Sequence, residues 1–234
     1  MSAIWLIRHG QASFHADDYD DLSPLGERQA RMLGASLKQR GVQPTGVYCG
    51  AMRRHQQTAA ACLAELGIEP KWIVDAGWNE YDHNDVLQQY DARYSSQRVL
   101  AAEMATHHAP QATFVKVFSA AVSRWTEGRN DADYRESWLA FNRRVVAALE
   151  RVKRQLNPHQ AVLVFTSGGV ISAVCRELLG LDDAHAWALN LRIANASTTK
   201  LLQGQQGLYL SCLNDHAHLE QAQAQDGTQW VSYF

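Results

Sequence analysis

Residues 3–10 read AIWLIRHG, an apolar run that leads directly into Arg8, His9 and Gly10. A buried strand over the apolar part would deliver an arginine and a histidine into the loop at its carboxyl end. A neutral imidazole can attack phosphorus through one ring nitrogen, and an adjacent guanidinium can bind two phosphate oxygens. The tripeptide alone fits a strand end with two exposed polar residues better, so the rest of the chain has to decide.

The composition is that of an ordinary globular protein: 234 residues, of which 46% are hydrophobic and 20% charged. A formal net charge of -2 provides no basic field, so neither nucleic acid nor a membrane is expected as a partner. No apolar stretch reaches the length of a membrane span, and the first strand begins too early for a signal segment to precede it. We therefore expect a cytoplasmic protein with a small phosphorylated ligand, held by a few local arginines.

The four cysteines lie far apart, and none is paired with another at metal-ligand spacing. This spacing predicts neither a disulfide framework nor a metal site. No cofactor is expected.

Apolar runs and helical periodicities alternate along the chain, which predicts an α/β fold with a mostly parallel central sheet and an antiparallel contribution near the C-terminus. The expected helices cover residues 23–40, 53–66, 133–156 and 170–179. The expected strands cover residues 3–7, 46–49, 71–74, 161–165, 189–193, 198–202 and 208–213. Residues 1–234 are interpreted as a single domain, in which residues 85–138 form a helical insertion that covers the site as a lid.

Four polar segments follow predicted strands, where ligands bind in open α/β sheets. They are Arg8 to Gly10, the start of the second helix with Arg54, the acidic Glu80, and the run that begins with Ser167. Within the second helix Arg53 is the less suitable ligand, because the helix turns it by about 100° from Arg54.

Three spaced motifs resemble those of the histidine phosphatase superfamily, also called phosphoglycerate mutase-like. They are the strand with Arg-His-Gly at residues 6–10, Leu-Ser-x-x-Gly-x-x-Gln-Ala at residues 22–30, and Arg-x-x-Gln-Thr-Ala at residues 54–59. Glu80 falls where this family carries its acid. The resemblance covers most of the chain and implies the phosphoglycerate mutase-like three-layer α/β/α fold.

The resemblance implies that His9 takes the phosphoryl group, that Arg8 and Arg54 hold its oxygens, and that Glu80 protonates the leaving alkoxide before water hydrolyses the phosphohistidine. The residues themselves are consistent with this chemistry, because burial against Trp78 would raise the pKa of the Glu80 carboxyl and suit it to act as acid and then as base. Asp82, two residues further on, remains the alternative acid.

Ser167 departs from the family pattern, because it stands where the family has a second histidine. A neutral hydroxyl in place of a charge-assisted donor gives up roughly 1–2 kcal/mol, or about 5- to 30-fold in rate. Gly10, Ser167 and Gly168 are expected to bind phosphate. His15 is expected there too, since many relatives have an asparagine at its position that touches the phosphoryl group.

The leading hypothesis is a metal-independent phosphatase for a small phosphomonoester. The alternative is a catalytically weak or inactive member of the fold that binds a phosphorylated ligand. A phosphoglycerate mutase ranks last, because the site departs from the family pattern at Ser167 and His15. The physiological substrate and the oligomeric state remain open, including a homodimer through the sheet edge or the lid.

Overall fold

The computed structural model describes residues 1–13, 20–95, 99, 103, 106 and 108–233. These residues form two compact units. The first consists of Met1–Glu80 and Val145–Phe234, and the second of Tyr81–Arg144. The insertion expected over residues 85–138 falls within the second unit. No helix in the described part of the chain has the length and apolar character needed to cross a bilayer.

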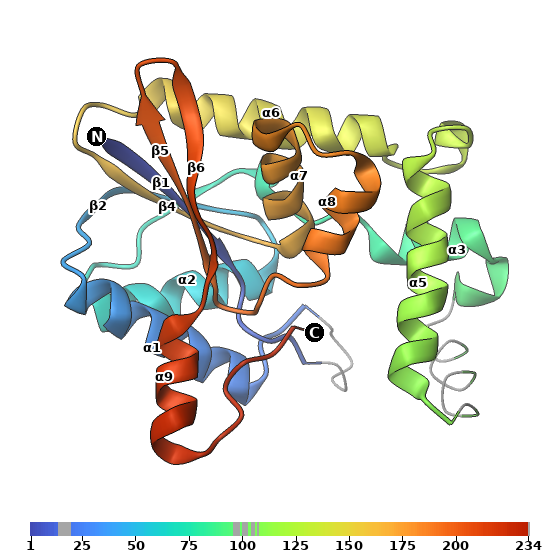
Figure 1. Cartoon of the computed structure of the whole chain (residues 1–234), viewed down its shortest axis with the longest axis horizontal. Coiled ribbons are helices and arrows are strands. Elements are labelled where there is room, and N and C mark those ends of the chain that lie inside the picture. The colour runs from blue at the N-terminus through green and yellow to red at the C-terminus, as the bar shows by residue number, and fades with distance from the viewer. Residues whose placement is uncertain (14–19, 96–98, 100–102, 104–105, 107, 234) are drawn as a thin grey trace. The chain divides into compact units, whose positions relative to one another are not determined.

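A six-stranded sheet with the strand order β3-β2-β4-β1-β5-β6 forms the centre of the first unit (Figure 1). Its strands are β1 (Ser2–Arg8), β2 (Pro44–Cys49), β3 (Ile73–Val74), β4 (Ala161–Thr166), β5 (Thr198–Gly204) and β6 (Gly207–Asp215). Strands β1 to β4 run parallel to one another, whereas β5 pairs antiparallel with both β1 and β6. This arrangement confirms the predicted α/β class and its mostly parallel sheet.

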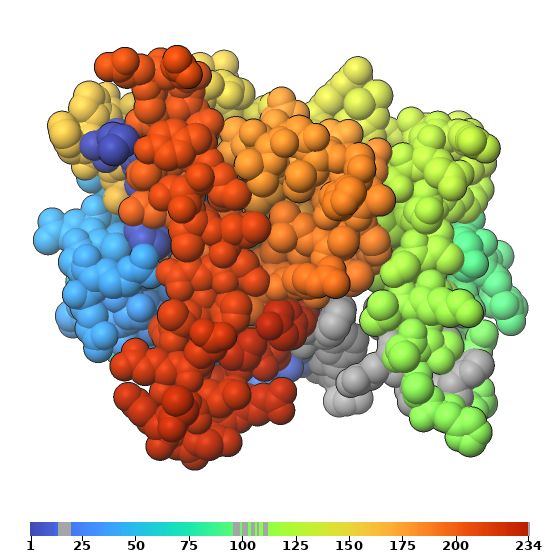
Figure 2. Space-filling model, viewed as in Figure 1, coloured from blue at the N-terminus to red at the C-terminus, as the bar shows by residue number. Residues whose placement is uncertain are grey.

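Helices cover both faces of this sheet. They are α1 (Pro24–Gln39), α2 (Arg53–Leu66), α7 (Gly168–Leu179), α8 (Asp183–Asn190), α9 (Ala217–Asp226) and the later part of α6 (Trp138–Gln155), with a short 3-10 helix η1 (Ala76–Trp78). Figure 1 shows α1 and α2 on one side of the sheet and α7 on the other. In Figure 2, β5, β6 and α9 form a continuous orange to red band along one face of the first unit.

The alternation of side chains along β1 determines which residues meet α1 and α2. Ala3, Trp5 and Ile7 belong to one core cluster, while Ile4 and Leu6 between them are buried on the opposite face. From the helices, α1 and α2 contribute Leu33, Leu37, Ala59, Cys62, Leu63 and Leu66 to this cluster. Because β1 is buried on both faces, its end is held at a fixed position in the fold.

Capping residues set the helix boundaries that were predicted from the sequence. Ser23 accepts a hydrogen bond from the backbone nitrogen of Gly26 (3.0 Å) and Pro24 occupies the first turn of α1. Gly67 and Gly180 end α2 and α7 in the left-handed conformation. The predicted ends of these helices are confirmed.

The helix predicted over residues 133–156 begins later than expected, because α6 starts at Trp138. The backbone nitrogen of Arg135 donates to Asp85 (2.8 Å) instead of entering a helical ladder. The Ser137 hydroxyl then accepts from the amide three residues further on (3.2 Å), as an N-cap residue does. The apolar periodicity extended the prediction into a segment that long-range hydrogen bonds hold outside the helix.

The strand predicted over residues 189–193 is wrong, because the first part of this segment belongs to α8. Asp182 begins that helix by accepting a hydrogen bond from the backbone nitrogen of His185 (2.8 Å). A turn follows, in which the backbone nitrogen of Arg192 donates to Leu189 (2.9 Å). Five mostly apolar residues were too short a run to distinguish a strand from a helix end.

The second unit contains α3 (His83–Tyr90), η2 (Ala92–Ser95), α5 (Pro110–Thr126), η3 (Asp131–Asp133) and the first turns of α6. Its centre is a cluster of aromatic rings. The centroid of Trp125 lies 4.8 Å from that of Tyr81, 5.0 Å from that of Trp138 and 5.7 Å from that of Phe141. This small core gives the segment a packing centre of its own.

Candidate active site

The carboxyl ends of β1, β2 and β4 meet at one edge of the sheet. Arg8 pairs with Thr166 at the end of the β1–β4 ladder, and the backbone nitrogen of His9 donates to the Thr166 carbonyl (2.9 Å). On the other side of β4, the backbone nitrogen of Gly50 donates to Phe165 (3.0 Å). The residues that follow these three strands are thereby brought together.

His9 is buried, and its ring is held by the residue that follows it. Its Nδ1 lies 2.7 Å from the carbonyl oxygen of Gly10. A carbonyl can only accept, so Nδ1 carries the proton and Nε2 of the neutral ring presents a lone pair. Burial, followed by the positive charges of Arg54 and Arg8, holds the pKa of His9 well below its ordinary value. At neutral pH the ring therefore carries only the Nδ1 proton, and its Nε2 is able to act as a nucleophile.

Gly10 connects the loop after β1 to α2. Its backbone nitrogen donates to the Thr58 hydroxyl (3.1 Å), and that hydroxyl donates to the carbonyl of Arg54 one turn earlier (2.6 Å). A Cβ at Gly10 would lie 2.3 Å from the backbone oxygen of Gly26, so a larger residue would force the backbone to move. Glycine is needed here for close approach of two backbones.

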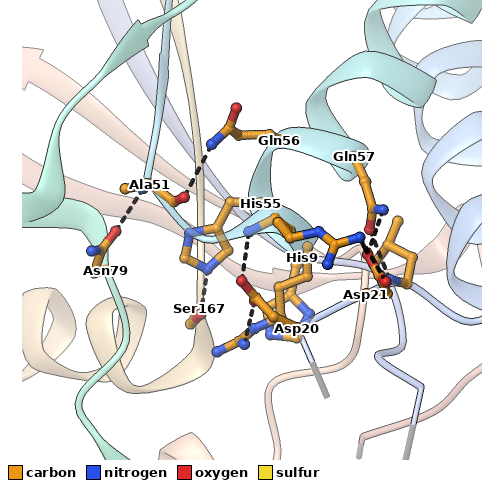
Figure 3. A network of polar contacts seen from close by, with 12 residues as sticks. His9, Asp20, Asp21, Ala51, His55, Gln56, Gln57, Asn79 and Ser167 are labelled. Carbon is orange, nitrogen blue, oxygen red and sulfur yellow. Dashed lines mark hydrogen bonds and ion pairs between the residues drawn. The ribbon is translucent and has the colours of Figure 1, made fainter. Parts of the chain in front are cut away.

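The two neighbouring arginines of α2 have different environments. The side chain of Arg54 is 4% exposed and pairs with Asp20 (2.8 Å), whereas that of Arg53 is 55% exposed and pairs with Asp21 (2.7 Å). Figure 3 draws both aspartates in the polar network at the start of α2. Of these two arginines, Arg54 is the buried one and Arg53 the exposed one.

Arg8 lies against the first turn of α7. Its Nη1 donates to the carbonyl of Ile193, and a Cβ at Gly168 would lie 3.6 Å from its Nε. The structure thus places the two predicted arginines on two sides of His9: Arg8 precedes it in β1, and Arg54 approaches from α2. Both are close enough to act electrostatically on the imidazole.

Glu80 is buried at the N-terminus of α7, where its Oε2 accepts a hydrogen bond from the backbone nitrogen of Gly169 (3.0 Å). This position is favourable for a carboxylate, because helix N-termini bind anions. Asp82, the alternative acid, caps α3 by accepting from the backbone nitrogen of Asn84 (3.0 Å) and pairs with Arg135 (3.2 Å). The contacts of Asp82 therefore stabilise α3, while Glu80 is held at the first turn of α7.

Ser167 is fully buried, and its hydroxyl contacts a residue that the sequence did not single out. Its Oγ lies 2.6 Å from Nε2 of His55 (Figure 3). His55 is also fully buried, and its ring centroid lies 5.7 Å from that of His9. Burial, and then Arg54, holds the pKa of His55 well below its ordinary value. The one available signal was that a histidine directly follows Arg54 within the third motif.

Residues 4–216 match the histidine phosphatase superfamily (branch 1). The chain belongs to this superfamily. A segment of 97 residues is 36% identical to the 2,3-bisphosphoglycerate-dependent phosphoglycerate mutase of Methylobacterium sp. (strain 4-46), covering 38% of the chain and 47% of that relative. The chain thus spans less than half the length of the curated relative that it matches.

Solved structures of the same fold cover nearly the whole chain. The alpha-ribazole phosphatase from Shigella flexneri has a TM-score of 0.62 at 23% identity, covering 91% of this chain and 96% of the other. The phosphoglycerate mutase from Bacillus anthracis has a TM-score of 0.62 at 18% identity, covering 93% and 94%. At these identities the similarity establishes the fold of this histidine phosphatase superfamily member and leaves its reaction open.

In this superfamily member, a loop near the C-terminus hydrogen-bonds to the backbone carbonyls of Arg8 and His9. The backbone nitrogen of Ala196 donates to the carbonyl of Arg8 (3.1 Å), and the Asn195 amide donates to that of His9 (3.2 Å). The Ser232 hydroxyl in turn donates to Asn195 (2.9 Å). Asn195 and Ala196 lie more than 180 residues from the two carbonyls that they support, so these contacts form only in the folded chain.

His15 lies outside the described residues, so its expected place beside the phosphoryl group stays a prediction. The other predicted site residues of the superfamily member follow β1, β4 and η1 or begin α2 and α7. They are Arg8, His9, Gly10, Arg54, Glu80, Ser167 and Gly168. They provide a neutral imidazole that two guanidinium groups influence electrostatically, and a carboxylate at the N-terminus of α7.

Proposed function

We propose that the chain is a metal-independent phosphatase that hydrolyses a small phosphomonoester through a phosphohistidine on His9. The observation that carries the proposal is the 2.7 Å contact between Nδ1 of His9 and the Gly10 carbonyl. It leaves the lone pair on Nε2 of a ring whose pKa is lowered by burial and by two arginines. A nucleophile held in one tautomer, beside fixed positive charge, suits attack on phosphorus.

In the first step of the proposed reaction, Nε2 of His9 forms a bond to phosphorus while the bond from phosphorus to the ester oxygen breaks. Arg8 and Arg54 bind the non-bridging oxygens, whose charge must be stabilised in the transition state. Glu80 donates its proton to the departing alkoxide, which is a poor leaving group without one. The alcohol leaves, and Glu80 is ionised.

In the second step, water attacks the phosphohistidine. Glu80 takes a proton from the water as the new oxygen–phosphorus bond forms, and the nitrogen–phosphorus bond breaks with its electron pair returning to His9. Inorganic phosphate is released, and the enzyme is restored. Gly10, Ser167 and Gly168 are proposed to bind the phosphoryl group throughout, together with His15.

Hydrolysis of p-nitrophenyl phosphate across about pH 5 to 8, with a chelator present, tests the proposal. Wild-type protein should release nitrophenol, His9→Ala should show none above background, and His185→Ala, which changes an exposed histidine, should match wild type. Activity that survives in His9→Ala, or that the chelator removes, would contradict it. Inactive wild type that still binds phosphate would favour the phospho-ligand-binding alternative.

The similarity to phosphoglycerate mutases keeps that reaction as a second outcome of the same experiment. A mutase returns the phosphoryl group to its substrate and requires a bisphosphate to prime the enzyme. Multiple turnovers with release of inorganic phosphate and no primer support the phosphatase, whereas turnover only with 2,3-bisphosphoglycerate and 3-phosphoglycerate supports the mutase.

A further inference from the structure

His55 and Ser167 form a buried polar pair directly beside His9. Their side chains are both fully buried, and Nε2 of His55 lies 2.6 Å from Oγ of Ser167. Ser167 follows Thr166, whose carbonyl accepts from the backbone nitrogen of His9 (2.9 Å). The pair thus lies on the neighbouring strand end, within reach of the group that His9 would bind.

The Ser167 hydroxyl does not cap α7, although Ser167 occupies the N-cap position of that helix. Ser167 precedes the first residue of α7 with the extended backbone of an N-cap. A serine there normally accepts a hydrogen bond from an amide of the first turn. Ser167 makes no such bond, because its hydroxyl contacts His55 instead. The contact is therefore a specific arrangement and not a by-product of helix capping.

The surroundings of His55 indicate which of its nitrogens carries the proton. Burial and Arg54 lower the pKa of His55, so the ring is neutral and has one N–H. Among the described residues, Nδ1 of His55 is buried without a hydrogen-bond partner. It lies against the backbone of Gly50, where a Cβ would come within 2.2 Å. A buried N–H without an acceptor is rarer and costlier than an unused lone pair, which places the proton on Nε2.

With this tautomer, His55 donates to the Ser167 oxygen, and the hydrogen of the Ser167 hydroxyl remains available for another acceptor. His9 cannot accept this hydrogen during the reaction, because the lone pair on its Nε2 is then directed at phosphorus. A phosphoryl oxygen bound at His9 would be a strong acceptor for that hydrogen.

We infer that His55 is a positioning residue, which holds the Ser167 hydroxyl so that it donates its hydrogen to the phosphoryl group bound at His9. This inference rests on the proposed function. Together the two side chains provide a fixed donor from the end of β4. Ser167 contacts the phosphoryl group, and His55 acts only through Ser167.

A double-mutant cycle tests this dependence. Ser167→Ala should lower kcat for p-nitrophenyl phosphate by about 5- to 30-fold, and His55→Asn should lower it comparably. The double variant should be no worse than Ser167→Ala alone, because His55 has no other route to the substrate. Independent losses that multiply would overturn the inference. The buried Ser2, whose hydroxyl bonds to Asn157 (2.7 Å) at the other end of β1, provides the control Ser2→Ala.

A conservative variant separates positioning from mere packing. The amide nitrogen of glutamine can occupy the place of Nε2, whereas that of the shorter asparagine cannot. His55→Gln should therefore recover most of the activity that His55→Asn loses. Equal loss in the two variants, with unchanged thermal unfolding, would contradict a positioning role.

Long-range nitrogen–proton NMR of wild-type protein provides a readout that does not depend on the activity of any variant. The spectrum should show the Nε2–H tautomer for His55, assigned by the signals missing in His55→Gln. The opposite tautomer would make Ser167 the donor to His55 and would overturn the inference.

Binding of inorganic phosphate, measured by calorimetry, distinguishes failure of this inference from failure of the proposed function. Ser167→Ala and His55→Asn should bind phosphate more weakly than wild type, and His55→Gln should bind nearly as well. If wild type binds phosphate in this pattern but hydrolyses nothing, the proposed function fails and the positioning role stands. If hydrolysis depends on His9 but neither Ser167→Ala nor His55→Asn changes phosphate binding or kcat, the positioning role fails and the proposed function stands.

Discussion

The ends of β1 and β4 are neighbours in the sheet, but they hold their polar residues in different ways. His9, after β1, is fixed by the carbonyl of the next residue, Gly10. Ser167, after β4, is fixed by His55, which lies 112 positions earlier in the chain. A side chain oriented by its own loop can be recognised from a local motif. One oriented by a distant helix becomes visible only in the folded chain.

The largest expected effect on activity comes from α2, which carries Arg54 near His9 and His55 in contact with Ser167. Arg54→Ala should lower kcat/KM for p-nitrophenyl phosphate by about 10²- to 10³-fold, because it removes a fixed positive charge from the transition state. Arg53→Ala is the matched control and should change it by less than about twofold, since the Arg53 side chain is 55% exposed and its ion pair is screened by solvent. Steady-state kinetics of the two variants decide the matter, and equal effects would refute the distinction between the arginines.

Glu80 contacts the first turn of α7, which follows β4. Its effect on the rate should be greatest when the leaving group needs a proton. Glu80→Gln should lower kcat for an alkyl phosphate by about 10²-fold or more. The loss with p-nitrophenyl phosphate should be smaller, because nitrophenolate departs without protonation. Rates for both substrates give the ratio directly. A ratio that is unchanged from wild type would mean that Glu80 is not the acid.

Ser167→His tests whether a histidine can replace the serine that follows β4 while His55 is present. The new imidazole would meet the His55 ring, whose Nε2 already lies 2.6 Å from the Ser167 oxygen. We expect the single variant to lose about tenfold or more in kcat, a cost typical of overpacking in a buried site. Ser167→His combined with His55→Ala should recover activity relative to the single variant. Better activity of the single variant would show that the two histidines fit side by side.

The smallest expected effect is on how the free energy of unfolding depends on pH. The pKa of His55 is lowered in the folded protein below its ordinary value of 6.5, so the unfolded state binds more protons below that pH. The stability that the neutral ring contributes is therefore present above pH 6.5 and declines as pH falls, by up to about 1.4 kcal/mol per pH unit. Urea unfolding at several pH values should show a shallower decline for His55→Gln.

Much of the fold was predictable because its signals are local. The β1 run is apolar throughout and is buried on both faces, and Ser23, Pro24 and Gly67 mark helix ends through backbone chemistry that any helix shares. The start of α6 was not predictable in this way. The backbone of Arg135 is held by Asp85, 50 residues earlier, and periodicity carries no information about such a bond.

The same distinction applies to the site. Two of the three motifs place His9, Gly10 and Arg54 at strand and helix ends, and the structure brings them together. The family resemblance favoured Glu80 over Asp82, but the different contacts of the two carboxylates, with α7 and within α3, are visible only in the fold. His55 was missed because its partner belongs to another strand end, and a histidine within a helix carries no mark of burial.

Trapping of the phosphorylated protein tests the central claim most directly. Wild-type protein mixed with substrate and quenched within milliseconds in alkali should carry one phosphoryl group, which mass spectrometry locates on His9 and which acid removes. A phosphoryl group on Ser167, stable in acid, would contradict the account, and so would turnover without any phosphorylated protein.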